Sequence, residues 1–141
     1  MPERRIERTT EGGLNVSGSH EHLRRFVDEL GGAGIRVSMF IEAELHQLEA
    51  AHALGAPVVE LHTGAYCEAS DAPRQVHLDR IRQAAHHADV LGLECHAGHG
   101  LGYDSIGPIA GITNIVELNI GHFLIGEAIF DGLDTAIRRM R

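Results

Sequence analysis

The sequence predicts an α/β fold, and within that class it favours about half of a (β/α)8 TIM barrel over a doubly wound sheet. Its 141 residues give one helix followed by four repeats of a strand and a helix, which is typical of a parallel sheet with right-handed crossovers. No Gly-x-Gly-x-x-Gly follows the first strand, although a dinucleotide-binding sheet carries that motif there. In addition, each strand has one polar and one apolar side.

The polar side of the strands separates the two architectures. In a doubly wound sheet helices cover both faces, so both faces should be apolar. One parity here carries the polar residues Ser38, Glu42, Glu60, His62, Glu94, His96, Glu117 and Asn119. The other parity carries the apolar residues Val37, Met39, Ile41, Val59, Leu61, Val116, Leu118 and Ile120. A barrel with a polar lumen and helices outside explains this asymmetry.

For the first part of the chain the sequence predicts a loop, a helix, a strand and a second helix. Residues 1–18 are polar and contain glycines, so we expect a leading loop. Ser19 can cap a helix that ends at the glycine pair 31–32. The apolar residues of that helix recur at i, i+3, i+4 and i+7, at Leu23, Phe26, Val27 and Leu30. Residues 35–42 predict a strand, and residues 43–54 predict a helix.

The rest of the chain repeats the strand and helix pattern. Further strands are predicted at 58–62, 93–98 and 115–121. Further helices are predicted at about 72–91, 104–110 and 123–139. Asp71 and Pro73 open the first of these helices, and the dipeptide Gly107-Pro108 interrupts the second. In the last helix, four apolar residues at helical spacing share one face. They are Ile125, Ile129, Leu133 and Ile137.

Four strands are too few to close a barrel. The fold needs eight strands and typically about 250 residues. This chain also begins in a loop, with no strand before its first helix. As a monomer it would leave two parallel strand edges open, which is an aggregation hazard. We therefore expect about half of a barrel, which another chain or a further segment completes.

The composition of the chain excludes some classes of binding partner. The formal net charge of −8 argues against nucleic acid or an anionic membrane as a partner, whereas a small anionic substrate remains compatible with it. Cys67 and Cys95 have neither zinc spacing nor a disulfide framework, which suggests a reducing cytoplasm. The polar N-terminus predicts no secretory signal, and no apolar run reaches the roughly 20 residues that span a bilayer.

The segment Ala97-Gly98-His99-Gly100-Leu101, at the end of the third strand, is the strongest local motif. Its glycines let the backbone approach a ligand closely and expose His99 at the barrel mouth. A well-placed histidine transfers protons near neutral pH and contributes about 10²–10⁴-fold in rate. The alternative is a histidine that caps a turn.

The segment Asn119-Ile120-Gly121-His122 ends the last strand and precedes a helix. The first amides of a helix are unpaired donors at the positive end of its dipole, so they bind phosphate. Barrels often hold phosphate between the loops after their last two strands. The alternative is a tight turn that needs glycine for its geometry alone.

Two further segments are weaker candidates. Strand parity points Glu60 and His62 into the lumen, where a buried carboxylate could stabilise a cation or exchange protons. For His62 we favour a lumen ion pair. Residues 8–14, which include Thr9, offer hydroxyls and glycine amides to a phosphorylated ligand, but a flexible linker explains them as well.

A metal site is a minor alternative. The candidate ligands are His96 and His99, with Glu60, His62 and His122 nearby. His96 and His99 differ in strand parity, and no aspartate completes a familiar ligand spacing. We therefore expect no metal.

Several segments in one register resemble the pyridoxine 5′-phosphate synthase family. They are Thr-Thr-Glu-Gly-Gly-Leu at 9–14, Glu-Leu-His-Thr-Gly at 60–64, Ala-Gly-His-Gly-Leu at 97–101 and Glu-Leu-Asn-Ile-Gly-His at 117–122. Residues 34–41 and 54–57 fit as well. The match runs from Pro2 almost to the end, and it covers only the later half of the family's chain. The resemblance therefore implies that residues 1–141 are the C-terminal half of one (β/α)8 domain.

The resemblance implies a reaction and a set of roles. The family condenses 1-deoxy-D-xylulose 5-phosphate with 3-amino-2-oxopropyl phosphate to pyridoxine 5′-phosphate, phosphate and water, without metal or organic cofactor. His99 then matches the proton donor and Glu60 a carboxylate that stabilises the transition state. Thr9 matches a contact to the pentulose phosphate. The contacts to the aminoketone phosphate match Gly100, Gly121 and His122.

The resemblance also sets expectations for the chain by itself. The family's first strands carry a second histidine, a glutamate used as a base, and groups that grip the substrates, so we expect little or no turnover from this chain alone. A homo-oligomer is expected. Two other readings remain: a metal-dependent barrel hydrolase or lyase, and a non-catalytic half-barrel that binds a phosphorylated ligand.

Overall fold

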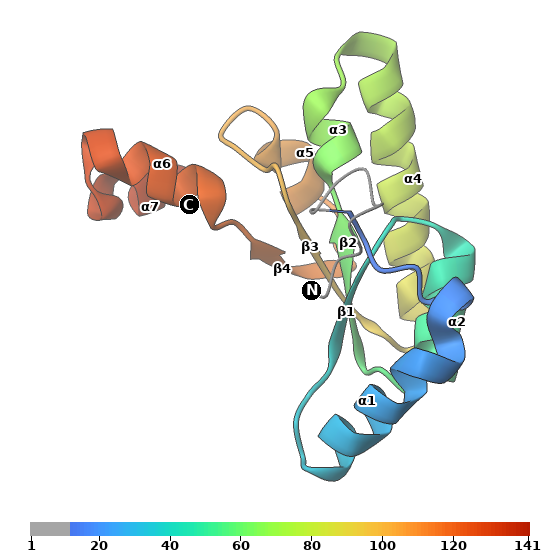
Figure 1. Cartoon of the computed structure of the whole chain (residues 1–141). Coiled ribbons are helices and arrows are strands. Elements are labelled where there is room, and N and C mark those ends of the chain that lie inside the picture. The colour runs from blue at the N-terminus through green and yellow to red at the C-terminus, as the bar shows by residue number, and fades with distance from the viewer. Residues whose placement is uncertain (1–11) are drawn as a thin grey trace.

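The described part of the chain is one parallel sheet with helices between its strands. A computed structural model describes residues 12–141 (Figure 1). The strands are β1 (Ser38–Ile41), β2 (Val58–His62), β3 (Glu94–Gly98) and β4 (Ile115–Asn119). All neighbouring pairs are parallel, and the spatial order follows the chain order. The predicted alternation and the parallel sheet are thus confirmed.

Helices occupy most of the remaining chain. They are the 3₁₀ turn η1 (Ser17–Ser19), α1 (His20–Gly32), α2 (Leu45–Ala53), α3 (Gly64–Glu68), α4 (Asp71–Val90), α5 (Ile106–Ala110), α6 (His122–Asp131) and α7 (Leu133–Met140). The α2 helix stops where Gly55 adopts a φ of 82°, a left-handed conformation that glycine adopts without steric cost.

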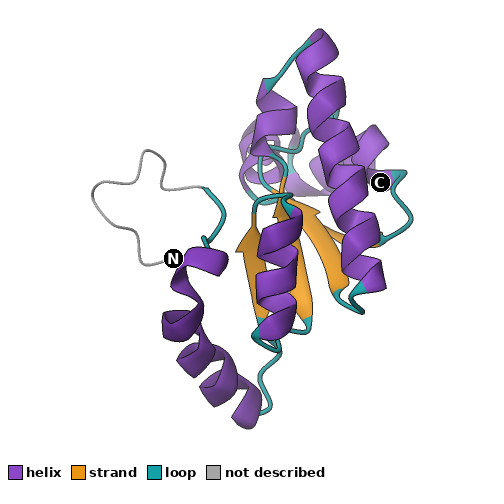
Figure 2. Ribbon diagram, turned by 90° about the vertical axis from the view of Figure 1, so that its right-hand side faces the viewer, coloured by secondary structure: helices purple, strands orange, loops and turns teal. Residues whose placement is uncertain are grey.

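The apolar side of the strands faces the helices. Figure 2 shows α2 and α4 against one face of the sheet. Ile41, Val59 and Leu61 are fully buried there, together with Leu48 of α2 and Ala84 of α4. Because side chains alternate along a strand, this burial turns the polar parity to the opposite face, as the sequence predicts.

The polar face forms layers across the sheet. The register aligns Phe40 with Glu60, Glu60 with His96, and His96 with Glu117. His96 Nε2 lies 2.7 Å from a carboxylate oxygen of Glu94, and His96 Nδ1 lies 3.5 Å from one of Glu117. The buried His96 therefore joins neighbouring carboxylates of the lumen.

Three local predictions are wrong. Residues 64–68 form the short helix α3 instead of a loop. Pro108 does not interrupt its helix but lies inside α5. The helix tolerates it because a proline in the first turn removes only an amide that would be unpaired anyway. The last helix is divided at Gly132, whose φ of 80° breaks the helical path between α6 and α7. The predicted loop 1–18 lies mostly outside the described residues.

Several apolar residues expected in the core are exposed. In the bulge between β3 and β4, Ile115 faces Cys95 and Glu117 faces His96, so Val116 is the extra residue and is 66% exposed. The α6–α7 pair lies to one side of the sheet in Figure 1. The large apolar side chains that this pair exposes are Ile125, Ile129, Phe130, Leu133 and Ile137. In α1, Phe26 and Leu30 are exposed as well.

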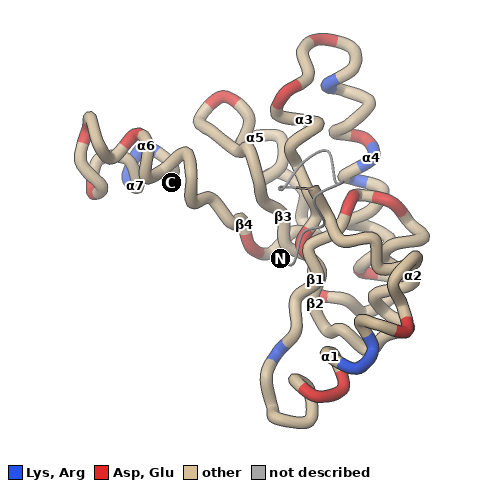
Figure 3. Tube along the Cα trace, viewed as in Figure 1, with Lys and Arg blue, Asp and Glu red and all other residues tan. Residues whose placement is uncertain are grey.

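Charged residues are spread over the described elements. Figure 3 shows acidic residues on loops and helices in several parts of the molecule, with arginines between them. No helix among residues 12–141 combines the length and the apolar character that crossing a membrane requires.

Candidate functional site

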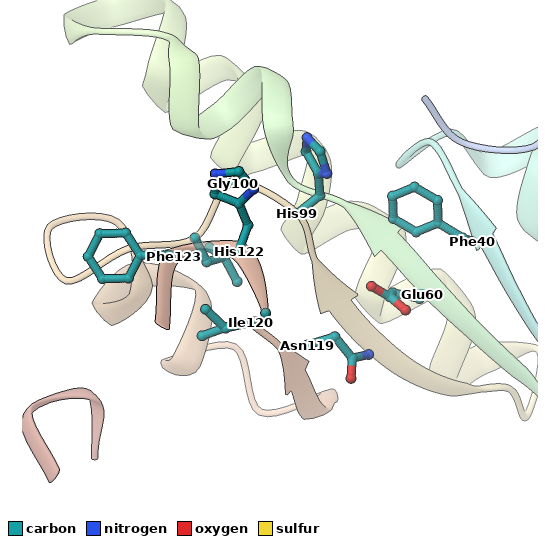
Figure 4. Close-up of a pocket in the computed structure, with 10 residues that line it drawn as sticks. Phe40, Glu60, His99, Gly100, Asn119, Ile120, His122 and Phe123 are labelled. Atoms are coloured by element: carbon teal, nitrogen blue, oxygen red, sulfur yellow. The ribbon is translucent and has the colours of Figure 1, made fainter. Parts of the chain in front are cut away.

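Residues of β1, β2 and β4 and of the segments that follow β3 and β4 line a cavity of about 590 Å³. The residues that line it are Phe40, Glu60, His99, Gly100, Leu101, Asn119, Ile120, Gly121, His122 and Phe123 (Figure 4). The two glycine turns, at 98–100 and at 121, therefore open on one space. Parallel pairing of β3 with β4 explains this, because Gly98 is aligned with Asn119 and the following turns leave the sheet side by side.

The backbone of His99 is held in an uncommon conformation. Its φ of 76° lies in the left-handed region, which is costly for a residue with a Cβ atom. The Thr63 hydroxyl lies 2.8 Å from the Gly98 carbonyl oxygen and 2.5 Å from that of His99, so it can donate to either. The Thr63 amide also donates to Gly98 O at 2.9 Å. Thr63 is fully buried, and it anchors the turn that presents His99 to the cavity.

Glu60 is a half-buried carboxylate on the cavity floor. Burial raises its pKa above the usual range, while a hydrogen bond with Asn119 and the nearby His96 act in the opposite direction. A Cβ atom at position 98 would collide with the Glu60 carboxylate, so glycine at this position admits the carboxylate to the sheet. Figure 4 shows Glu60 and His99 on neighbouring strand ends of the same cavity.

The start of α6 supplies amide donors without any side-chain cap. Gly121, the N-cap residue, has a φ of −101°, and α6 has no acidic residue in its first turn. A Cβ atom at Gly121 would meet no atom of the described chain within 4 Å. A tight turn therefore does not explain this glycine, and a side chain at position 121 would enter open space at the start of the helix. Such a helix end suits an anion.

Glu42 and Phe40 are functional candidates that the sequence did not single out. Glu42 Oε1 lies 2.8 Å from His62 Nδ1, and hydrogen bonding with His62 holds the pKa of Glu42 below its usual value. This contact is the lumen ion pair that we favoured for His62. The signal was present in the strand parity, since Phe40 and Glu42 share the polar side with Glu60 and His62.

The other sequence candidates are placed as follows. Thr9 lies outside the described residues. His96 does not line the cavity, because it sits one layer below the strand ends. Among residues 12–141, no three histidine, cysteine, aspartate or glutamate side chains converge as metal ligands would. The roles assigned to His99, Glu60, Gly100, Gly121 and His122 stay predictions, although the cavity brings all five together.

Comparison with known proteins gives a consistent family. A family model described as "Pyridoxal phosphate biosynthesis protein PdxJ" matches residues 1–141. A pyridoxine 5′-phosphate synthase of Rhodospirillum rubrum is 64% identical over all of this chain, and one of Gluconobacter oxydans is 55% identical. The chain spans 57% and 59% of the length of these two relatives.

A solved structure supports the barrel architecture. The xylose isomerase domain protein from Planctomyces limnophilus aligns with a TM-score of 0.55 at 17% identity, over 86% of this chain and 58% of that chain. At this identity the likeness concerns the fold alone. The four strand–helix units are therefore part of a TIM-barrel fold, as the strand parity predicts.

Loss of the Thr63 hydroxyl should loosen the His99 turn. In Thr63→Val the carbonyls of Gly98 and His99 lose a buried donor, and we expect a cost of about 1–3 kcal/mol in the free energy of unfolding. Thr63→Ser keeps the hydroxyl and should retain most of that stability. Urea titration followed by circular dichroism measures both variants, and equal stability of Val and Ser variants would contradict the assignment.

The raised pKa of Glu60 predicts a pH-dependent stability. Because the folded chain binds this proton more tightly than the unfolded chain, Glu60 favours folding at low pH and opposes it once pH rises through the folded pKa. Glu60→Gln should therefore raise the melting temperature relative to the parent chain at pH 8, and the difference should vanish towards pH 4. The exposed Glu29→Gln serves as control, and a Glu60→Gln effect independent of pH would contradict the burial argument.

Proposed function

Since the chain belongs to the PdxJ family, described as pyridoxal phosphate biosynthesis protein, we propose that it carries one side of a pyridoxine 5′-phosphate synthase site. The reaction condenses 1-deoxy-D-xylulose 5-phosphate with 3-amino-2-oxopropyl phosphate to pyridoxine 5′-phosphate, phosphate and water. The observation that carries this proposal is the single cavity shared by a histidine, a half-buried carboxylate and an uncapped helix start.

In this proposal the α6 helix start binds the phosphate of the aminoketone. Gly100, Gly121 and His122 contact the anion, and all three line the same cavity. The helix amides offer hydrogen bonds and the positive end of the dipole, which offset the acidic net charge of the chain locally. Thr9 contacts the pentulose phosphate.

His99 and Glu60 act on the reacting atoms. His99 donates a proton to the oxygen that leaves as water, for which an imidazole is suited near neutral pH. The Glu60 carboxylate stabilises the positive charge that develops when amine and ketone condense. Its half-buried carboxylate interacts more strongly with such a charge than a fully solvated one would.

The proposal includes the assembly around this site. We place residues 1–141 in the C-terminal half of a single (β/α)8 domain, with residues 1–18 leading into the site, in a cytoplasmic homo-oligomer that acts on small phosphorylated substrates. Support comes from the sheet, in which β1 and β4 each pair with one strand among the described residues. Exposed apolar residues such as Ile129 and Phe130 also suit burial against further elements.

Phosphate binding by this chain can be tested on α6 itself. We expect Gly121→Leu to weaken binding of 3-amino-2-oxopropyl phosphate at least about tenfold, because the side chain fills the space in front of the helix amides. Gly126→Leu is the matched control, since it adds the same side chain to open space on the same helix outside the cavity. Calorimetric titration with the substrate and with inorganic phosphate measures both. Equal affinities of the two variants would argue against the site.

The catalytic role of His99 requires a complete site. A chimera in which this chain replaces the matching stretch of the Rhodospirillum rubrum synthase should form pyridoxine 5′-phosphate. In that chimera His99→Asn should lower kcat by about 10²–10⁴-fold with a smaller effect on KM. His52→Asn on the outer surface of α2 is the control. An inactive parent chimera, or a His99→Asn variant with normal kcat, would overturn the proposal.

A further inference from the structure

We propose that Glu42 and His62 form a positioning pair for His99, a role that rests on the proposed function of His99. The three side chains follow one another across the carboxyl ends of β1, β2 and β3. Glu42 Oε1 lies 2.8 Å from His62 Nδ1, and the His62 and His99 ring centroids are 4.7 Å apart at an interplanar angle of 45°. Each member of the series therefore contacts the next.

The surroundings of His62 fix its ring on several sides. Its side chain is only 13% exposed. Phe40 packs edge-on against it, with centroids 5.2 Å apart and planes at 87°. A Cβ atom at Gly64 would come within 2.9 Å of His62 Cε1 and Nε2. The absence of a side chain at Gly64 therefore makes room for the His62 ring. A ring held in this way presents a defined surface to His99.

His62 acts through His99 in this arrangement and not on the substrate. It is absent from the cavity lining, whereas Glu60, two residues before it on the same strand, is present. The Glu42 carboxylate lies 2.8 Å from Nδ1 and contacts the ring on the side of β1. His62 thus offers a side chain of fixed orientation against which the His99 imidazole packs.

Positioning matters because the direction of the His99 ring decides where its proton is delivered. His99 lies on a turn between glycines, and its backbone adopts the left-handed conformation. Thr63 anchors the carbonyl groups of that turn, and the His62 ring packs against the imidazole itself. Contact with His62 restricts the ring to orientations that face the cavity, and small errors in orientation reduce rates strongly.

A second histidine–glutamate contact, outside the cavity, serves as a control that distinguishes positioning of His99 from general stabilisation of the fold. His87 Nε2 and Glu49 Oε1 form a similar contact of 3.4 Å between α4 and α2, away from the cavity. Removal of its carboxylate in Glu49→Gln changes a histidine–glutamate contact without touching the strand ends. Glu42→Gln and His62→Phe are the test variants, and the second keeps an aromatic ring while removing Nδ1.

The first test uses the 141-residue chain and needs no activity. Imidazole resonances of His99, assigned with His99→Asn, are recorded by heteronuclear NMR. We expect Glu42→Gln and His62→Phe to shift and broaden them, and Glu49→Gln to leave them in place. Phosphate-ester affinity should stay within about twofold, because the α6 helix start is unchanged. Unaltered His99 resonances in both test variants would overturn the proposal.

The second test measures turnover in the chimera. Glu42→Gln should lower kcat by about 10- to 100-fold with KM nearly unchanged, since substrate binding stays intact and only the orientation of His99 is lost. Glu42→Asp keeps the carboxylate and should recover part of the rate. If His99→Asn impairs kcat while Glu42→Gln and His62→Phe do not, the positioning role fails and the proposed function stands. If His99→Asn has no effect, the proposed function fails, and the NMR result decides on the pair alone.

Discussion

The parallel pairing of β2 with β3 is the constraint on which the site depends. Its register sets His62 opposite Gly98, so the chain that follows β2 meets the chain that follows β3. Thr63 then reaches the carbonyls of Gly98 and His99, and this contact holds a backbone conformation that a histidine would otherwise rarely adopt. A shift of one residue in this pairing would turn Glu60 and His62 towards the helices, because side chains alternate along a strand. Register therefore determines both the cavity and the turn that presents His99.

The two faces of the sheet are stabilised by different interactions. Burial of Ile41, Val59 and Leu61 against α2 and α4 provides the hydrophobic contribution. The opposite face is polar, and its layers are joined by contacts such as His96 with Glu94 and His62 with Glu42. Polar groups in a lumen require partners, because an unpaired buried group costs free energy. The same requirement places ionisable side chains in the layer next to the cavity, where they are available for chemistry.

The two glycine turns of the cavity have different physical reasons. Gly98 is glycine because the Glu60 carboxylate and the backbone carbonyl oxygen of Asn119 occupy the place of its side chain. At Gly121 the described chain imposes no such demand, although this residue lines the cavity. The first glycine thus admits a catalytic candidate to the sheet, and the second leaves room for a ligand at the helix start. The phosphate assignment of α6 depends on this difference.

The sequence by itself determined the alternation of strands with their main helices, the parallel sheet, the polar and apolar sides of the strands and the glycine turns around His99 and Gly121. These features are local or periodic, so the spacing of residues along the chain contains them. Tertiary structure alone decided that Glu42 contacts His62, that Thr63 anchors His99, and that Val116 leaves the strand alternation in a bulge. It also decided that Ile125 and Ile129 stay exposed. Each of these depends on which strand or helix lies opposite, and helical or strand spacing shows which side of an element is apolar without showing what covers it.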